Sequence, residues 1–188
     1  GWGELENQKG ATTLLFPFVQ DAREAERAVA ATRYPPEGVR GAAGVHRASR
    51  YGTVPDYFRV AAREICVAVQ VETLAALDGI EAIAKVPGVD TIFVGPSDLS
   101  ASMGLLGDAG HADVQAKLAH AAQVCKRLGK PAGIIGPNPE MVARYVGYGY
   151  TWVAIGSDMS MMMGRAQEWL GLARGRPHVA GPPAQGSY

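Results

Sequence analysis

The sequence predicts an α/β fold in which a parallel sheet is covered by helices. Five short segments are almost continuously apolar, an amphipathic segment follows most of them, and Gly- or Pro-containing turns join the two kinds. Continuous apolar runs are typical of strands that are buried on both faces. Their regular alternation with helical segments favours βα units wound in one direction over separate layers of strands and helices.

Each expected strand is short and ends at a polar or turn-forming residue. The first reads Thr-Thr-Leu-Leu-Phe-Pro-Phe-Val, and the second ends in Gln70-Val71-Glu72. The expected strands are residues 12–19, 65–71, 91–94, 132–135 and 152–155.

The helical segments follow the same order. The first has Asp21 as an N-cap and stops before Pro35 and Pro36, and two later segments end at Gly129 and Gly149. A glycine-rich loop, residues 38–44, follows the first helix. The expected helices are residues 22–32, 56–63, 74–85, 114–128, 140–148 and 159–173.

The chain length bears on the architecture. A (β/α)₈ barrel is the best-known fold with so many strand-to-helix turns, but it usually needs about 250 residues, whereas this chain has 188. We expect one folded region, residues 11–174, between an N-terminal segment, residues 1–10, and a tail, residues 175–188. The tail has no hydrophobic period, so we expect it to be extended or disordered.

Composition excludes several classes of function. Eighteen basic and 18 acidic side chains balance, without long runs of one sign, which argues against a nucleic-acid partner. No apolar stretch approaches the roughly 20 residues that span a bilayer. No basic segment followed by an apolar one opens the chain, so we expect a cytoplasmic protein. Cys66 and Cys125 form no disulfide framework, and we expect both to be core thiols.

Polar side chains gather just after the expected strands. In parallel α/β sheets, the carboxyl ends of the strands carry the chemistry. The polar residues at these positions are Gln20, Gln70, Glu72, Ser97, Asp98, Asn138, Ser157 and Asp158.

Glu72 and Asp98 follow two successive strands, so we expect their carboxylates to meet above the strand ends. Two anions at one place repel each other unless a cation lies between them. No histidine or cysteine occurs at these strand ends, and carboxylates alone suit a hard divalent cation such as Mg²⁺ or Mn²⁺. The alternative is that each carboxylate only stabilises the start of the helix that follows it.

Several strings together resemble a known family. They are Gln-Val-Glu-Thr at 70–73, Phe-Val-Gly-Pro-Ser-Asp-Leu-Ser at 93–100 and Ala-Ile-Gly-Ser-Asp at 154–158, with the upstream segments 33–41 and 47–50. In order and spacing, the sequence resembles the HpcH/HpaI family of class II, metal-dependent pyruvate aldolases. The 2-dehydro-3-deoxyglucarate and 4-hydroxy-2-oxo-heptanedioate aldolases are the most similar members.

The resemblance implies a TIM (β/α)₈ barrel, here its C-terminal five βα units, in a homo-oligomer such as a trimer or hexamer. It implies cleavage of 4-hydroxy-2-oxo acids to pyruvate and a small aldehyde through a metal-stabilised enolate. The divalent metal, Mg²⁺, Mn²⁺ or Co²⁺, would be held by Glu72 and Asp98. Gln70 would hold metal-bound water or substrate, and Ser97, with the N–H groups of Ser97 and Asp98, would receive the pyruvate carboxylate.

The sequence also departs from that family. Neither the general-base histidine nor the enolate-stabilising arginine has a counterpart, and the first strand corresponds to the family's fourth. About three βα units are therefore expected to be missing before Gly1. Either the sequence is part of a longer protein or the gene is truncated or frame-disturbed, and both are favoured over a genuine shortened variant. Two alternative functions remain: a citrate-lyase-like carbon–carbon lyase, and a catalytically silent partial barrel that retains metal and pyruvate binding.

Two further clusters have alternative interpretations. Arg40, His46, Arg47 and Arg50 form a local basic group that either contacts an acidic distal group of the substrate or belongs to a solvated loop or subunit contact, and the second interpretation is favoured. We do not assign His46 as a replacement base. The methionine run of residues 159–163 is expected to pack in the core or at an interface.

Overall fold

A computed structural model describes residues 9–175 of the chain. The expected tail and most of the N-terminal segment lie outside the described residues. Five parallel strands form a single sheet in the order in which they occur along the chain. The strands are β1 (Thr13–Phe16), β2 (Cys66–Val71), β3 (Thr91–Val94), β4 (Ala132–Ile135) and β5 (Trp152–Ala154).

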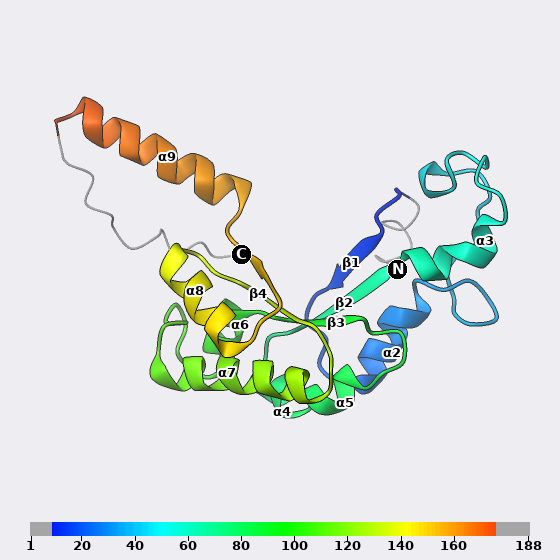
Figure 1. Cartoon of the computed structure of the whole chain (residues 1–188), viewed down its shortest axis with the longest axis horizontal. Helices are drawn as coiled ribbons and strands as arrows, with labels where there is room; N and C mark the ends of the chain where they lie inside the picture. Colours follow the sequence, from blue (N-terminus) through cyan, green and yellow to red (C-terminus); the bar gives the residue numbers. More distant parts are fainter. Residues whose placement is uncertain (1–8, 176–188) are drawn as a thin grey trace.

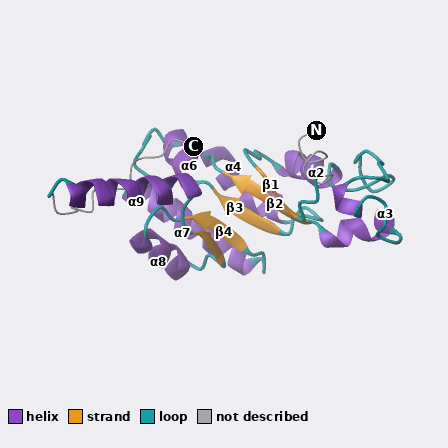
Figure 2. Cartoon of the chain, turned by 90° about the horizontal axis from the view of Figure 1, so that it is seen from above, coloured by secondary structure: helices purple, strands orange, loops and turns teal. Residues whose placement is uncertain are grey.

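The sheet curls into half of a barrel, with helices along its outer face (Figure 1). Figure 2 shows the strands side by side. The α-helices are α2 (Ala22–Ala30), α3 (Tyr57–Val60), α4 (Leu74–Asp78), α5 (Ile80–Ala84), α6 (Pro96–Ser102), α7 (Ala112–Arg127), α8 (Pro139–Tyr148) and α9 (Asp158–Ala173). Two 3₁₀ turns, η1 (Arg47–Ser49) and η2 (Ala61–Glu64), flank α3. The predicted succession of five βα units is confirmed.

The core lies between the sheet and its covering helices. Alternate strand residues such as Val69 and Ile92 are fully buried there, against Leu118 of α7 and its neighbours. The intervening residues, among them Gln70 and Phe93, face the inside of the curl. Phe93 packs against Trp152 there, with the ring centroids 5.1 Å apart.

Several element boundaries differ from the predicted ones. The first strand ends at Phe16, because Pro17 has no N–H to donate and Phe18 has a left-handed backbone (φ 59°). The predicted helix 74–85 is two short helices, divided at Gly79, whose ψ of 5° departs from helical geometry. Cys125 is buried as expected, but Cys66 is only half-buried at the start of β2.

The core interpretation of the methionine run is wrong. Met159, Met161, Met162 and Met163 are each about half exposed, between 48% and 56%, and α9 buries none of its residues. The reason is topological, since β5 is the last strand and α9 extends beyond it, away from the sheet (Figure 1). The interface interpretation stays a prediction. Within residues 9–175, no helix has the length and apolarity needed to cross a bilayer.

Candidate functional site

The two carboxylates singled out in the sequence lie at the carboxyl ends of neighbouring strands. Glu72 directly follows β2, and Asp98 lies in the first turn of α6, which follows β3. The strands pair in register, with Val71 opposite Val94, so their ends lie level. The two side chains lie close enough for the Asp98 carboxylate to act electrostatically on Glu72. The expected meeting of Glu72 and Asp98 above the strand ends is therefore present.

Glu72 is held rigidly. Only 3% of its surface is exposed. One carboxylate oxygen, Oε1, accepts a 2.8 Å hydrogen bond from the backbone N–H of Phe18. The other, Oε2, accepts from the side-chain amide of Gln70, two residues earlier on the same face of β2. Both oxygens keep a further lone pair for a ligand.

The backbone donor at Phe18 is held in place by Gln20. The left-handed backbone of Phe18 is costly for a residue with a side chain and persists only where the surroundings enforce it. The Gln20 amide donates to the Phe18 carbonyl at 3.2 Å, and its oxygen accepts from the hydroxyl of Thr73 at 2.7 Å. Gln20 thus ties the loop after β1 to the residue that follows Glu72.

The electrostatics of the pair disfavour two uncompensated negative charges. Burial is the main cause that raises the pKa of the Glu72 carboxyl; hydrogen bonds from Gln70 and Phe18 oppose this rise, and the neighbouring Asp98 adds to it. In residues 9–175, neither carboxylate forms an ion pair with a lysine, arginine or histidine. A buried carboxylate beside a second one, without a protein cation, needs either a proton or a bound cation.

The donor set fits a hard divalent cation. The described part of the chain has no group of three or more His, Cys, Asp and Glu side chains that could enclose a metal. Two carboxylates with one neighbouring amide instead match cations such as Mg²⁺, which bind one or two protein carboxylates and keep several waters. Such a site leaves coordination positions for oxygens of a substrate.

Ser97 and Asp98 are exposed at the mouth of this site. They occupy the second and third positions of α6, whose N-cap is Gly95 and whose first residue is Pro96. Backbone N–H groups in a first turn have no partner inside the helix and point outward from its start. They lie next to the carboxylate pair, where they could receive an anionic group.

Gly95 is part of the site although the sequence interpretation gave it no role. A Cβ atom at Gly95 would lie 2.6 Å from Oε2 of Glu72 and 3.1 Å from the amide nitrogen of Gln70. Glycine therefore lets the backbone pass directly against the carboxylate. The Phe18 amide was missed for a different reason, since a backbone donor has no signature in residue type.

Two of the remaining polar residues at strand ends, Asn138 and Ser157, serve as helix caps. The oxygen of Asn138 accepts from the Met141 N–H at 2.9 Å, and the hydroxyl of Ser157 accepts from the Ser160 N–H at 3.1 Å. Asp158 is the first residue of α9 and is exposed. Asn138 and Ser157 are thus N-caps, whereas the interpretation of Asp158 as the N-cap of the last helix is wrong, because Ser157 occupies that position.

The basic cluster lies elsewhere. Residues 31–65 connect the end of α2 to the start of β2, so this connection, with Arg40 in it, lies at the amino ends of the strands, opposite Glu72. A role for Arg40 in gripping substrate at the Glu72 site of the same chain is wrong on this topology. The solvated-loop interpretation holds for Arg47 and Arg50, which are exposed, but not for Arg40, which is 1% exposed.

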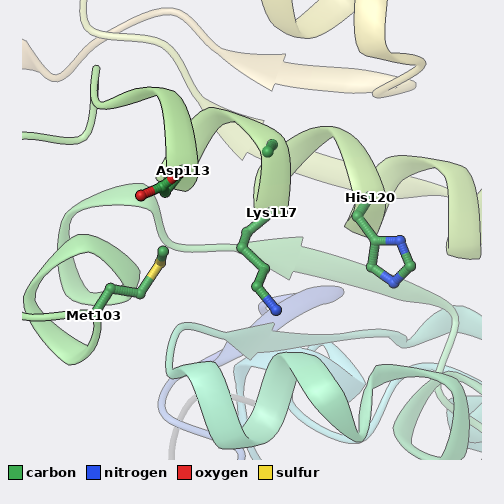
Figure 3. A pocket seen from close by; sticks show the side chains of 5 residues that line it. Met103, Asp113, Lys117 and His120 are labelled. Atoms are coloured by element: carbon green, nitrogen blue, oxygen red, sulfur yellow. The ribbon is translucent and has the colours of Figure 1, made fainter.

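A separate hollow of about 430 Å³ lies on the helical layer, between α6 and α7 (Figure 3). Met103, Asp113, Lys117 and His120 line it, and Lys117 pairs with Asp78 at 3.5 Å. It contains neither Glu72 nor Asp98. His120 is exposed there, as the sequence indicated.

Comparison with known proteins gives the same family as the resemblance in the sequence. The family model described as HpcH/HpaI aldolase/citrate lyase matches residues 4–164. A 2-dehydro-3,6-dideoxy-6-sulfogluconate aldolase from Pseudomonas putida is 47% identical over 167 residues, which make up 89% of this chain and 66% of that protein. A 5-keto-4-deoxy-D-glucarate aldolase from Salmonella arizonae is 48% identical over 159 residues, 85% of this chain and 62% of that protein.

Comparison with solved structures gives the same family. An HpcH/HpaI aldolase/citrate lyase family protein from Burkholderia cenocepacia superposes with a TM-score of 0.87 at 36% identity, over 91% of this chain and 68% of that one. The chain thus spans 66% and 62% of the lengths of the two aldolases above. With the family model, the sequence relatives and the fold in agreement, the chain belongs to the HpcH/HpaI aldolase/citrate lyase family.

Proposed function

We propose that this chain carries the metal-binding half of an aldolase site that cleaves 4-hydroxy-2-oxo acids to pyruvate and a small aldehyde. The observation that carries the proposal is the buried Glu72 carboxylate in contact with Asp98, without a protein cation. Two relatives at 47% and 48% identity are named as sugar-acid aldolases, which supports this reaction class.

In this proposal, Glu72 and Asp98 hold a divalent cation, Mg²⁺, Mn²⁺ or Co²⁺. A bound cation of this kind supplies Lewis-acid polarisation of a 2-oxo group. Gln70, which donates to Glu72, keeps its amide oxygen free to orient a water or a substrate hydroxyl. Ser97 and the N–H groups at the start of α6 receive the pyruvate carboxylate.

The acid–base step needs a group that the strand ends of residues 9–175 do not supply. Cleavage requires removal of the proton from the 4-hydroxyl, and histidine is the residue that most often does this. The described histidines, His46, His111 and His120, lie in a loop at the amino ends of the strands or on α7 and its cap. We therefore assign the binding of pyruvate to this chain and the proton transfer to a group outside residues 9–175.

We also propose that the chain works as a homo-oligomer, a trimer or hexamer. Strands β1 and β5 each have one neighbour in the described sheet, which leaves two edges with unpaired backbone groups. The exposed apolar residues of α9, such as Trp169 at 65%, are a further surface that assembly would cover.

The test is exchange of the methyl protons of pyruvate with deuterated water, followed by NMR in the presence of Mn²⁺ or Mg²⁺. Because this chain is assigned only the binding of pyruvate, imidazole buffer supplies the base in this assay. We expect buffer-dependent exchange by the full chain, and at least a hundredfold loss in Glu72→Gln, because the substitution removes one of only two anionic ligands. Glu64→Gln, at an exposed position on η2, is the matched control and should exchange as the parent does.

Two other outcomes are informative. Calorimetric Mn²⁺ binding without any exchange would identify a silent partial barrel that retains only the ligand site. Equal Mn²⁺ affinity in the parent and in Glu72→Gln would contradict the proposed metal site altogether.

A further inference from the structure

The described part of the chain has four buried polar side-chain atoms without a hydrogen-bond partner, and all four lie in one place. They are the hydroxyl of Tyr34, Nε and Nη1 of Arg40, and Nε2 of His46. Buried polar atoms are paired in most proteins, so such a concentration calls for a physical explanation. With Tyr57, these residues are called the Arg40 cluster below.

The members of the Arg40 cluster surround one aromatic ring. Arg40 donates from Nη2 to the hydroxyl of Tyr57 at 3.2 Å, and its guanidinium carbon lies 5.8 Å from the centroid of that ring. The His46 and Tyr34 rings have centroids 5.4 Å and 6.5 Å from the Tyr57 centroid, both edge-on. The Arg40 guanidinium also stacks over Tyr34, 4.5 Å from its centroid.

All four unpartnered atoms can act as donors. The two arginine nitrogens carry hydrogen and cannot accept. Nδ1 of His46 accepts the backbone N–H of Ser49 at 3.2 Å, so the neutral ring carries its proton on Nε2. Burial and the nearby Arg40 lower the pKa of His46, which favours that neutral ring. The Tyr34 hydroxyl can donate as well.

The Arg40 charge has no counter-ion in residues 9–175. Arg40 is 1% exposed and forms no ion pair with a described carboxylate. Stacking on Tyr34 stabilises the charge, but an aromatic face is a poor substitute for an acceptor at Nε and Nη1. A buried charge without a partner is among the costliest arrangements in a protein.

We propose that the Arg40 cluster is a binding site for a small free oxyanion, namely phosphate. An oxyanion supplies both the missing negative charge and several acceptor oxygens, and guanidinium groups bind such ions through charge-assisted hydrogen bonds. The site lies at the amino ends of β1 and β2, at the other end of the sheet from Glu72. Its occupant is therefore a second ligand rather than the 2-oxo acid bound at Glu72.

The surrounding segment permits entry. Within the described part of the chain, the backbone hydrogen bonds of residues 44–60 join residues of that segment or the adjacent Ala61, whose N–H donates to the Tyr57 carbonyl, and none of them joins a strand of the sheet. Three residues in it, Arg50, Tyr51 and Asp56, have left-handed backbones although none is glycine. Such strain is typical of segments whose conformation serves binding.

The test is a calorimetric titration of the full chain with inorganic phosphate in chloride buffer at constant ionic strength. We expect saturable binding, and at least about tenfold weaker binding in Arg40→Met, since charge-assisted bonds are the strongest in the site. Arg47→Met, an exposed arginine of the same loop, is the matched control and should bind phosphate like the parent. If Arg40→Met fails to fold by circular dichroism, Tyr34→Phe keeps the ring, removes one donor and should weaken binding severalfold.

The outcomes distinguish bound phosphate from a carboxylate of a second copy of the chain. Absence of phosphate binding, or equal binding by the parent and by the folded Arg40→Met or Tyr34→Phe variant, overturns the proposal. Self-association of the parent that is lost in Arg40→Met, without phosphate binding, also overturns it and assigns the acceptor to a carboxylate of a second copy. Loss of phosphate binding in Arg40→Met, while that variant still exchanges pyruvate protons at Glu72, supports the proposal independently of the proposed aldolase activity.

Discussion

The substitution Gly95→Ala tests the geometry of the carboxylate site directly. Gly95 has φ −91° and ψ 102°, a backbone that alanine adopts without strain, so only the added methyl group matters. Its carbon would lie 2.6 Å from Oε2 and 2.9 Å from Cβ of Glu72. Separations below 3.0 Å essentially never occur for real Cβ atoms, so the carboxylate must retreat by about 0.4 Å or more.

Glu72 has little room to retreat. It is 3% exposed, and its two oxygens are engaged by the Phe18 N–H and the Gln70 amide. Overpacking of a buried position costs about 1–3 kcal/mol of folding free energy. A displacement approaching 1 Å at a binding group costs up to about a hundredfold. We therefore expect Mn²⁺ affinity to fall roughly ten- to a hundredfold, with a measurable drop in Tm.

Calorimetric Mn²⁺ titration and thermal unfolding measure both effects. Gly147→Ala is the matched control, because a Cβ there meets no atom within 4 Å and the position lies in α8. That variant should bind Mn²⁺ like the parent and gain up to about 1 kcal/mol of stability from the helix propensity of alanine. Parent-like Mn²⁺ affinity and Tm in Gly95→Ala would refute the proposed close approach of the backbone to the Glu72 carboxylate.

Three further expectations follow from other parts of the chain. Gln20→Ala removes the hydrogen bonds to Phe18 and Thr73, each worth about 1 kcal/mol. We expect it to weaken Mn²⁺ binding severalfold while the far-UV circular dichroism spectrum stays unchanged. Parent-like Mn²⁺ affinity would show that the loop after β1 holds Glu72 without Gln20. Burial raises the pKa of the Cys125 thiol from 9.0 to about 11. The folded protein therefore keeps this proton to higher pH than the unfolded chain, and about 2 to 3 kcal/mol of stability is lost as pH rises from about 9 to about 11. Urea unfolding of Cys125→Ala at several pH values should show this alkaline loss reduced, and an identical slope would contradict the assignment. Met162→Gln, at a side chain 56% exposed on α9, should change the unfolding free energy of the monomer by less than about 0.5 kcal/mol; a larger loss would mean that α9 is packed.

The parallel sheet and the carboxylate pair could be predicted because both follow from patterns in residue type. Apolar runs alternating with amphipathic segments predict βα units, and parallel strands bring the residues after them to one edge. Glu72 and Asp98 therefore met as expected. The division of helix 74–85 at Gly79 was not anticipated, since single glycines are tolerated inside many helices.

Other features of the sites depend on tertiary structure alone. The Phe18 amide reaches Glu72 across 54 positions of sequence through a left-handed turn, and nothing in the residue types predicts that contact. Arginine is rarely fully buried, so its charge alone predicted a solvated loop at Arg40. In the structure the guanidinium instead lies against the rings of Tyr34 and Tyr57. The exposure of the methionines on α9 depends on which other elements pack against that helix, and this cannot be inferred from amino-acid composition.

The order of the strands has a consequence for how the site forms. Every strand pairs with the one before it in the chain, so the sheet can grow by adding one βα unit at a time, with mostly local contacts. Glu72 and Asp98 come from consecutive units, and the amide that holds Glu72 comes from the unit immediately before them. The ligand site can thus assemble from the first three strands, before β4 and β5 have docked. A divalent cation held there as proposed would favour the nascent sheet, and its binding would then be coupled to early folding of this chain.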